Sequence, residues 1–264
     1  MALFRSYITL TGVSSLDFEE AREDGLRGKK LGLVNGSSWI TLWSTYFGNE
    51  ILPGVKLVNI GNEAQQLNFM RAYHQGLPCP PQENITKTCA YARDLCQLYK
   101  PDAILLTCST MNRALPQVQA AVAEYGVPVI QIDMPMMEKA VDIGGNILIV
   151  ATHGPTVKST RLLLEETARR LGKAQGLTYR GALVEEAFER LSRGELEAHN
   201  ALIAHEIAKA RQEERIDCVV LAQLSMSLFC MEHTDPQAEF GIPVLCSGVE
   251  GFRRIREIFK AQEQ

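Results

Sequence analysis

The sequence predicts an α/β protein made of two parallel-sheet halves, related by a pseudo-twofold axis, with the active-site cleft between them. Three observations lead to this fold class. Short apolar segments alternate with longer amphipathic stretches, and part of this pattern is repeated within the chain. The composition is that of a folded domain, because 46% of the 264 residues are apolar and 22% are charged. Disordered chains lack the apolar content needed to build a core.

Seven segments are predicted to be strands because they are continuously apolar, as parallel strands covered on both faces are. They are Leu31–Asn35, Lys56–Ile60, Ala103–Thr107, Val127–Ile132, Ile147–Ala151, Cys218–Ala222 and Ile242–Cys246. Between them lie stretches with helical periodicity. The clearest are Ile85–Tyr99, Ala114–Tyr125, Val157–Leu171, Leu196–Glu214 and Phe252–Ala261. Alternation of strands and helices is typical of α/β folds with parallel sheets.

An internal repeat divides the chain into two halves. The segment Asp102–Met111 (DAILLTCSTM) recurs 115 residues later as Asp217–Met226 (DCVVLAQLSM). Gly126–Ile130 recurs at the same spacing as Gly241–Leu245, and the strand near Leu31 recurs near Ile147. We therefore expect a first half formed by residues 31–143 with 248–264, and a second half formed by 144–247. Residues 1–30 are expected to be an N-terminal extension.

The residues that follow the predicted strands are candidates for binding a ligand, because α/β proteins bind ligands beyond the carboxyl ends of their strands. These positions are rich in hydroxyl and amide groups and contain no Lys or Arg. Such a set could hold a small carboxylate through neutral donors, backbone N–H groups and helix dipoles. The candidates are Asn35, Gly36, Ser37, Ser38, Ser109 and Thr110 in the first half, and Thr152, Thr156, Leu224 and Ser225 in the second.

Cys108 is the candidate reactive group, because it lies where a strand ends and a helix begins. A thiol near a helix N-terminus has a lowered pKa. Most isolated cysteines are inert buried groups, and this is the favoured interpretation for Cys218, Cys230 and Cys246. The seven cysteines include no CxxC pair. A disulfide framework or zinc site is therefore not expected. We expect the protein to lie in a reducing cytoplasm, where its thiols stay free.

At this point the sequence resembles the aspartate/glutamate racemase superfamily. That group includes glutamate, aspartate and hydantoin racemases, maleate isomerase and arylmalonate decarboxylase. The resemblance lies in Leu106–Thr110 (LTCST), in Ala151–Ser159 (ATHGPTVKS) and in the turn Asn35–Ser38 (NGSS), and it covers about residues 31–252. It implies two α/β halves with a cysteine on each wall of the cleft, and Cys108 would be the first of them.

The sequence departs from this family where the second cysteine would lie. Gln223 occupies that position, and the internal repeat independently sets Gln223 against Cys108. Glutamine cannot exchange a proton at neutral pH, so racemisation by two opposed thiols is not available. His153 could supply the second proton, with His233 and His74 as lower-ranked candidates. Alternatively, Cys108 could act alone in an isomerisation. It could also protonate the product of a decarboxylation while Gln223 donates a hydrogen bond to the oxyanion.

The favoured function is a cofactor-independent racemase or isomerase that transfers a proton next to the carboxylate of a small acid. Alternatives are a decarboxylase similar to arylmalonate decarboxylase, a non-catalytic protein that binds small acids, and a hydrolase pairing Cys108 with His153. GxGxxG and GxxxxGK[ST] motifs are absent, so no cofactor is expected.

Few partners are expected besides a small carboxylate substrate. The formal charge is −4 and the pI is about 5.8, which argues against nucleic acid. No apolar stretch approaches the roughly 18 to 20 residues that span a bilayer. A homodimer is compatible with the family resemblance, and we expect the protein to be cytoplasmic.

Overall fold

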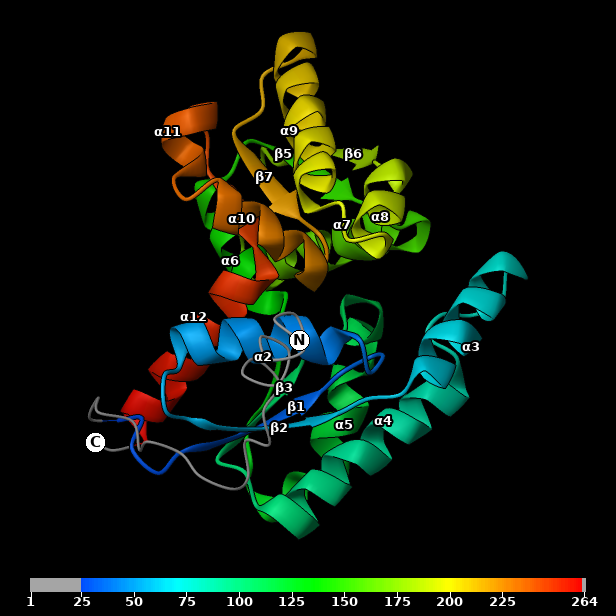
Figure 1. The fold of residues 1–264 in the computed structure, drawn as a ribbon, viewed down its shortest axis with the longest axis vertical. Helices are drawn as coiled ribbons and strands as arrows, with labels where there is room; N and C mark the ends of the chain where they lie inside the picture. Colours follow the sequence, from blue (N-terminus) through cyan, green and yellow to red (C-terminus); the bar gives the residue numbers. More distant parts are fainter. Residues whose placement is uncertain (1–24, 263–264) are drawn as a thin grey trace, which may run out of the picture. The chain divides into compact units, whose positions relative to one another are not determined.

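The computed structural model describes residues 25–262, which form two compact units (Figure 1). Unit 1 contains the chain up to Ile132 and from Gly251 onward, and unit 2 contains Asp133–Glu250. Most of the predicted N-terminal extension, up to residue 24, lies outside the described residues. The predicted fold class is confirmed, because each unit contains a four-stranded parallel sheet with helices beside it.

Unit 1 has a sheet with the strand order β2-β1-β3-β4. The strands are β1 (Lys30–Val34), β2 (Lys56–Ile60), β3 (Ala103–Leu106) and β4 (Val129–Gln131). The helices are α2 (Ile40–Ile51), α3 (Glu63–His74), α4 (Gln82–Asp94) and α5 (Leu115–Ala121), with a π-helical turn at Leu95–Tyr99 and 3₁₀ helices at Ser109–Ala114 and Ala123–Tyr125. All four residues of β3 are buried, as expected for a central strand covered on both faces.

Unit 2 has a sheet with the strand order β6-β5-β7-β8. The strands are β5 (Asn146–Ala151), β6 (Thr178–Leu183), β7 (Cys218–Leu221) and β8 (Val244–Cys246). The helices are α6 (Met134–Ile143), α7 (Gly154–Arg170), α8 (Glu185–Ser192), α9 (Leu196–Glu213), α10 (Phe229–Glu232) and α11 (Pro236–Phe240), with a 3₁₀ helix at Leu224–Leu228. Helix α12 (Ser247–Ala261) begins in unit 2 and continues into unit 1.

The internal repeat seen in the sequence is also a repeat of strand register. Leu31 of β1 pairs with Ala103 of β3, and Ile147 of β5 pairs with Cys218 of β7. The two pairs are related by the sequence spacing of the repeat. Residues that follow β1 and β3 therefore have defined counterparts after β5 and β7.

One aspartate in each unit joins the amino ends of the two central strands. The Asp102 carboxylate accepts a hydrogen bond from the backbone N–H of Lys30 at 2.8 Å. Asp217 accepts the equivalent bond from Asn146 at 2.9 Å. This backbone donor, together with Arg215, holds the pKa of Asp217 below its usual value. The repeated aspartate thus fixes the same pair of strands in both units.

The repeated glycines end helical turns in the same way. Gly126 has a φ of 65° and Gly241 a φ of 66°. Only glycine adopts this left-handed conformation without steric cost from a Cβ atom, so both positions suit the turn that leads into β4 and β8.

Two features differ from the sequence expectation. Strand β6 was not predicted, because it is an edge strand whose partly exposed sequence TYRGAL has no continuous apolar run. Residues 134–143, which we expected in the first half, form helix α6 of unit 2. Its buried residues Met136, Met137 and Ala140 pack with Ile147 and Leu164 in a core cluster of that unit.

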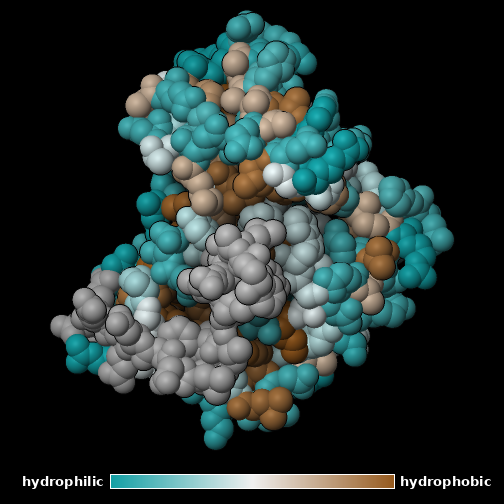
Figure 2. Space-filling view, viewed as in Figure 1, coloured by the Kyte–Doolittle hydropathy of each residue, from teal (hydrophilic) through white to brown (hydrophobic). Residues whose placement is uncertain are grey.

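On the face drawn in Figure 2, hydrophilic residues predominate and hydrophobic residues form small areas between them. Among residues 25–262, no helix is long and apolar enough to cross a membrane.

Candidate active site

Cys108 lies two residues after β3, at the carboxyl end of this central strand of the unit 1 sheet. It is half-buried and extended, and a 3₁₀ helix begins directly after it. Its sulfur lies 3.0 Å from the Thr110 hydroxyl. A Cβ atom built at Gly36 would lie 2.3 Å from the same sulfur. The glycine at the end of β1 therefore allows the sulfur to sit against the backbone. The structure brings these three predicted site residues together.

A buried polar network supports this strand end. The Asn35 side chain donates to the Asn59 carbonyl at 2.9 Å, and its own carbonyl accepts from the Thr107 hydroxyl at 2.5 Å. Asn59 in turn donates to Thr45 at 3.0 Å and accepts from Ser44 at 3.0 Å. Asn35 was predicted to bind substrate, but in the structure its carboxamide makes hydrogen bonds within the scaffold. These bonds fix the loop that carries Gly36.

Replacing Asn35 with leucine is expected to destabilise the protein by about 1–3 kcal/mol, because the buried hydrogen bonds of its side chain with Asn59 and Thr107 would both be lost. Urea unfolding followed by circular dichroism measures this loss. Asn68 is the control, because it is a half-buried asparagine whose side chain donates to the buried Asn84 at 2.8 Å between α3 and α4, away from the strand end. A loss for Asn35→Leu no larger than for Asn68→Leu would contradict the prediction.

Two serines follow Gly36 and differ in their contacts. The Ser37 side chain is 1% exposed, and its hydroxyl makes no hydrogen bond with any described residue. Ser38 is exposed, and its hydroxyl donates to the carboxylate of Glu63 at the start of α3. This bond and nearby backbone N–H groups lower the pKa of Glu63. The sequence analysis missed Glu63, although its position three residues after the predicted strand Lys56–Ile60 places it at the same sheet edge.

In unit 2, Gln223 occupies the position that corresponds to Cys108. Its side-chain carbonyl accepts hydrogen bonds from the Thr152 backbone N–H at 2.7 Å and from the Thr152 hydroxyl at 3.2 Å. Because the backbone N–H can only donate, the amide is oriented with its oxygen toward Thr152. The amide nitrogen makes no hydrogen bond with the part of the chain that the structure describes. Thr152 is the counterpart of Gly36, so the same two positions are in contact in each unit.

The other predicted residues of unit 2 lie on the same loops. Thr156, in the first turn of α7, has a buried hydroxyl with no partner among residues 25–262. His153 precedes α7, and its ring centre lies 5.5 Å from that of Phe188. Leu224 and Ser225 are buried in the 3₁₀ helix that follows Gln223.

Ser247 is a further candidate that the sequence analysis missed. It lies directly after β8 and is fully buried. Its hydroxyl makes no hydrogen bond with a described residue. The feature of the sequence that could have identified Ser247 is its position immediately after the predicted strand Ile242–Cys246.

The two lower-ranked histidines are not at the ends of strands. His74 is the last residue of α3 and is exposed. His233 follows α10, where its ring stacks on Phe229 with centres 4.1 Å apart and its Nδ1 lies 2.6 Å from a carboxylate oxygen of Glu239.

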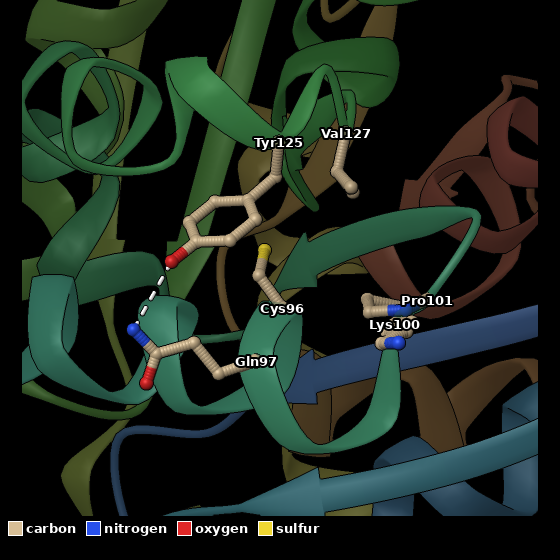
Figure 3. Close-up of a pocket in the computed structure, with 6 residues that line it drawn as sticks. All are labelled: Cys96, Gln97, Lys100, Pro101, Tyr125 and Val127. Atoms are coloured by element: carbon tan, nitrogen blue, oxygen red, sulfur yellow. Dashed lines mark hydrogen bonds between the residues drawn. The ribbon is translucent and has the colours of Figure 1, made fainter.

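A pocket of about 450 Å³ in unit 1 lies at the opposite end of the sheet from Cys108. Lys100 and Pro101 line it just before β3, whereas Cys108 follows that strand. Figure 3 shows a hydrogen bond between Gln97 and Tyr125 at its edge, with a length of 3.0 Å. This pocket does not include any of the predicted site residues.

Comparison with known proteins adds a family and a set of similar folds. The model of the Asp/Glu/Hydantoin racemase family matches residues 79–255. No curated protein matches the chain. Among solved structures, an aspartate racemase homologue from Pyrococcus horikoshii is 19% identical with a TM-score of 0.63, covering 88% of this chain and 99% of that one.

Two further structures have the same fold. Glutamate racemase isoform RacE1 from Bacillus anthracis is 15% identical with a TM-score of 0.60, covering 89% of this chain and 83% of that one. Allantoin racemase from Klebsiella pneumoniae is 15% identical with a TM-score of 0.58, covering 89% of each chain. At these identities the likeness concerns the fold alone.

Proposed function

Because the chain belongs to the Asp/Glu/Hydantoin racemase family and is a racemase-type enzyme, we propose that Cys108 moves a proton at the carbon next to a carboxylate of a small acid. The observation that carries this proposal is the position of the sulfur, at a strand end, against Gly36 and 3.0 Å from Thr110. No cysteine stands at the equivalent position of unit 2, where the residue is Gln223. We therefore propose that one face of the substrate is served by a thiol and the other by a different group.

The proposed reaction begins with the Cys108 thiolate. The Thr110 hydroxyl, 3.0 Å from the sulfur, can donate a hydrogen bond to this charged form and so favour it. The thiolate takes the proton from the α-carbon, and the remaining charge spreads onto the carboxylate as an enediolate. Neutral donors fixed in advance stabilise such a charge without reorganisation. The amide nitrogen of Gln223 is the proposed donor, because its carbonyl already bonds Thr152.

Return of a proton to the opposite face needs a second acid. His153 is the proposed group, because it is next to Thr152 and imidazole titrates near neutral pH. If no second acid acts, Cys108 returns the proton to the face from which it came. The product is then the same acid with an exchanged hydrogen, or an isomer where the proton is delivered to a neighbouring carbon, and not the mirror image of the substrate.

The proposed carboxylate ligands are the hydroxyl groups at the strand ends. Ser37 and Thr156 have buried hydroxyls that make no hydrogen bond within residues 25–262. A buried polar group without a partner costs about 1–3 kcal/mol, which a ligand oxygen would offset. Thr110 and Ser225 complete the proposed set, and none of these residues is charged. A small carboxylic acid is therefore the proposed substrate class.

We also place this chemistry in the cytoplasm. All seven cysteines are free in the structure, and free thiols persist in a reducing compartment. A thiol that serves as acid and base must be reduced, because an oxidised sulfur cannot exchange a proton, and a reducing compartment favours that state.

A decarboxylase is the second candidate, and Gln223 is the observation that favours it. Loss of carbon dioxide from a malonate generates an enediolate without any base. Cys108 would then need only to deliver one proton, while the free amide nitrogen of Gln223 donates to the oxyanion. This reaction explains a site with one thiol as well as one-base isomerisation does.

Incubation in heavy water distinguishes these functions. The panel contains aspartate, glutamate, hydantoins, hydroxy acids and substituted malonates, and NMR detects deuterium at the α-carbon. Exchange into an unchanged acid supports the isomerase. Release of carbon dioxide, with one deuteron in the product, supports the decarboxylase. Binding of panel members without either reaction would overturn both and indicate a protein that only binds acids.

Replacing Gln223 with cysteine is expected to add racemase activity, or to raise it by at least 10-fold, because a thiol at this position can exchange protons. The measurement is the rate at which optical activity is lost from the acid that shows the fastest exchange. An unchanged rate together with unchanged affinity would show that Gln223 does not act on the substrate.

Gln223→Glu is the matched control for this experiment. Its carboxylate still accepts from the Thr152 N–H and hydroxyl, but it no longer offers the amide donor. We expect an unchanged unfolding temperature and a lower kcat/KM. A kcat/KM equal to that of the wild type in this variant would show that the amide nitrogen does not take part in the reaction.

A further inference from the structure

Two cysteines of unit 2 lie close together without being bonded. The sulfur of Cys230 is 3.3 Å from that of Cys246, and the Cys230 thiol donates a hydrogen bond to it. Cys230 lies on α10 and is half-buried, whereas Cys246 ends β8 and is 2% exposed. The proposed reaction uses neither residue, so this pair calls for a separate explanation.

The surroundings of Cys246 favour its thiolate. The hydrogen bond from Cys230 lowers the pKa of Cys246, and the Ser227 hydroxyl and the Val249 backbone N–H add to this effect against the cost of burial. Cys218 provides a contrast within the same unit, because burial raises its pKa to about 12. A thiolate is the form that attacks an oxidised sulfur.

The geometry also suits a bond between the two sulfurs. A disulfide has a length of about 2.05 Å, so the atoms need to approach by little more than about 1 Å. The half-buried thiol lies on a helix of four residues, preceded by a 3₁₀ helix and ending before His233. Closing the gap therefore requires a small displacement of this short helix relative to β8.

The pair is an addition to the repeated scaffold. In unit 1 the residues 115 positions earlier are Leu115 and Gln131, neither of which has a thiol. The repeat therefore does not require sulfur at either place.

We propose that Cys230 and Cys246 are a modification site, at which a hydroperoxide converts the thiol pair into an intramolecular disulfide. Cys230 first passes its proton to the Cys246 thiolate, and the Cys230 thiolate attacks a peroxide oxygen to give a sulfenic acid and hydroxide. This hydroxide takes the proton back from Cys246 to form water. The Cys246 thiolate then attacks the Cys230 sulfur and displaces a second hydroxide, which takes a proton from solvent. One thiol and one thiolate lose two electrons and one proton, and with the solvent proton hydrogen peroxide is reduced to two waters.

The test uses the full chain, treated with hydrogen peroxide in the native state and then alkylated and digested. No Lys or Arg lies between Arg215 and Arg253, so trypsin leaves both cysteines on one peptide. A glutamyl endopeptidase is added, because Glu232 and Glu239 separate the two thiols. Mass spectrometry should then show two fragments linked with the loss of two hydrogen atoms. Dithiothreitol should release them.

Two serine variants make the result specific. Cys218→Ser removes the third cysteine of this region and should leave the yield of the linked fragments unchanged. Cys230→Ser alters a half-buried side chain and should abolish the link, with circular dichroism confirming the fold. Wild-type fragments that stay unlinked, or Cys230 recovered as sulfinic acid, would overturn the proposal. The readout is a mass and not an activity, so the result does not depend on the proposed function.

Discussion

Replacing Cys108 with serine is expected to lower the rate of deuterium exchange into the substrate by about 10²–10⁴-fold, the usual contribution of a general acid or base. A thiol has a reference pKa of about 8.5, whereas a serine hydroxyl holds its proton far more tightly. The smaller oxygen atom still fits against Gly36 and can still bond Thr110. The fold should therefore persist while proton transfer is lost. NMR in heavy water measures the rate, and thermal unfolding checks the fold.

Cys79→Ser is the matched control for this variant. Cys79 is half-buried like Cys108, but it lies on the loop before α4 and not at a strand end. Its replacement should leave the exchange rate within about 2-fold of wild type, because surface substitutions away from special features have small effects. Wild-type exchange in Cys108→Ser would show that another residue transfers the proton.

Replacing Gly36 with alanine should reduce activity by at least about 10²-fold, because it displaces the reacting sulfur without altering its chemistry. The new Cβ would lie 2.3 Å from the sulfur of Cys108 and 2.9 Å from its Cβ, so the cysteine has to move. A displacement of about 1 Å can cost this factor in rate. Overpacking should also reduce the free energy of unfolding by about 1–3 kcal/mol.

Gly32→Ala separates loss of geometry from loss of stability. Gly32 lies on the same strand, and a Cβ there would lie 3.0 Å from the end of the flexible Leu95 side chain. This variant should lose some stability and keep its exchange rate. Equal rates for the two alanine variants would argue against the contact between Gly36 and Cys108 as a requirement of the reaction.

Periodicity and the internal repeat were sufficient to predict the two sheets. Buried parallel strands have continuous apolar runs, so β2 was predicted at its observed bounds, Lys56–Ile60. Strand β6 was not predicted, because Arg180 and Gly181 interrupt the apolar run of this exposed edge strand. Residues 134–143 were assigned to the first half because the packing of α6 against Leu164 is a tertiary contact that local sequence does not specify.

The candidate site was predictable where it depended on strand ends. The contacts of Cys108 with Gly36 and of Gln223 with Thr152 follow from parallel strands that end at one edge. The engagement of Asn35 within the scaffold did not follow, because its partner Asn59 comes from a different strand. Glu63 and Ser247 are single polar residues without a motif, and their position after a predicted strand was the only feature of the sequence that pointed to them.

The repeated aspartates have a consequence for how this protein could change over time. Asp102 and Asp217 join the central strands at their amino ends, which are the ends farthest from the candidate site residues. The central strands of each sheet are thereby held together at their amino ends. Residues at the carboxyl ends of these strands can therefore be substituted without changing the register of the strands. The Cys108 thiol and the Gln223 amide are then different side chains at equivalent positions of one repeated scaffold. A new reaction can arise by substitution at either position.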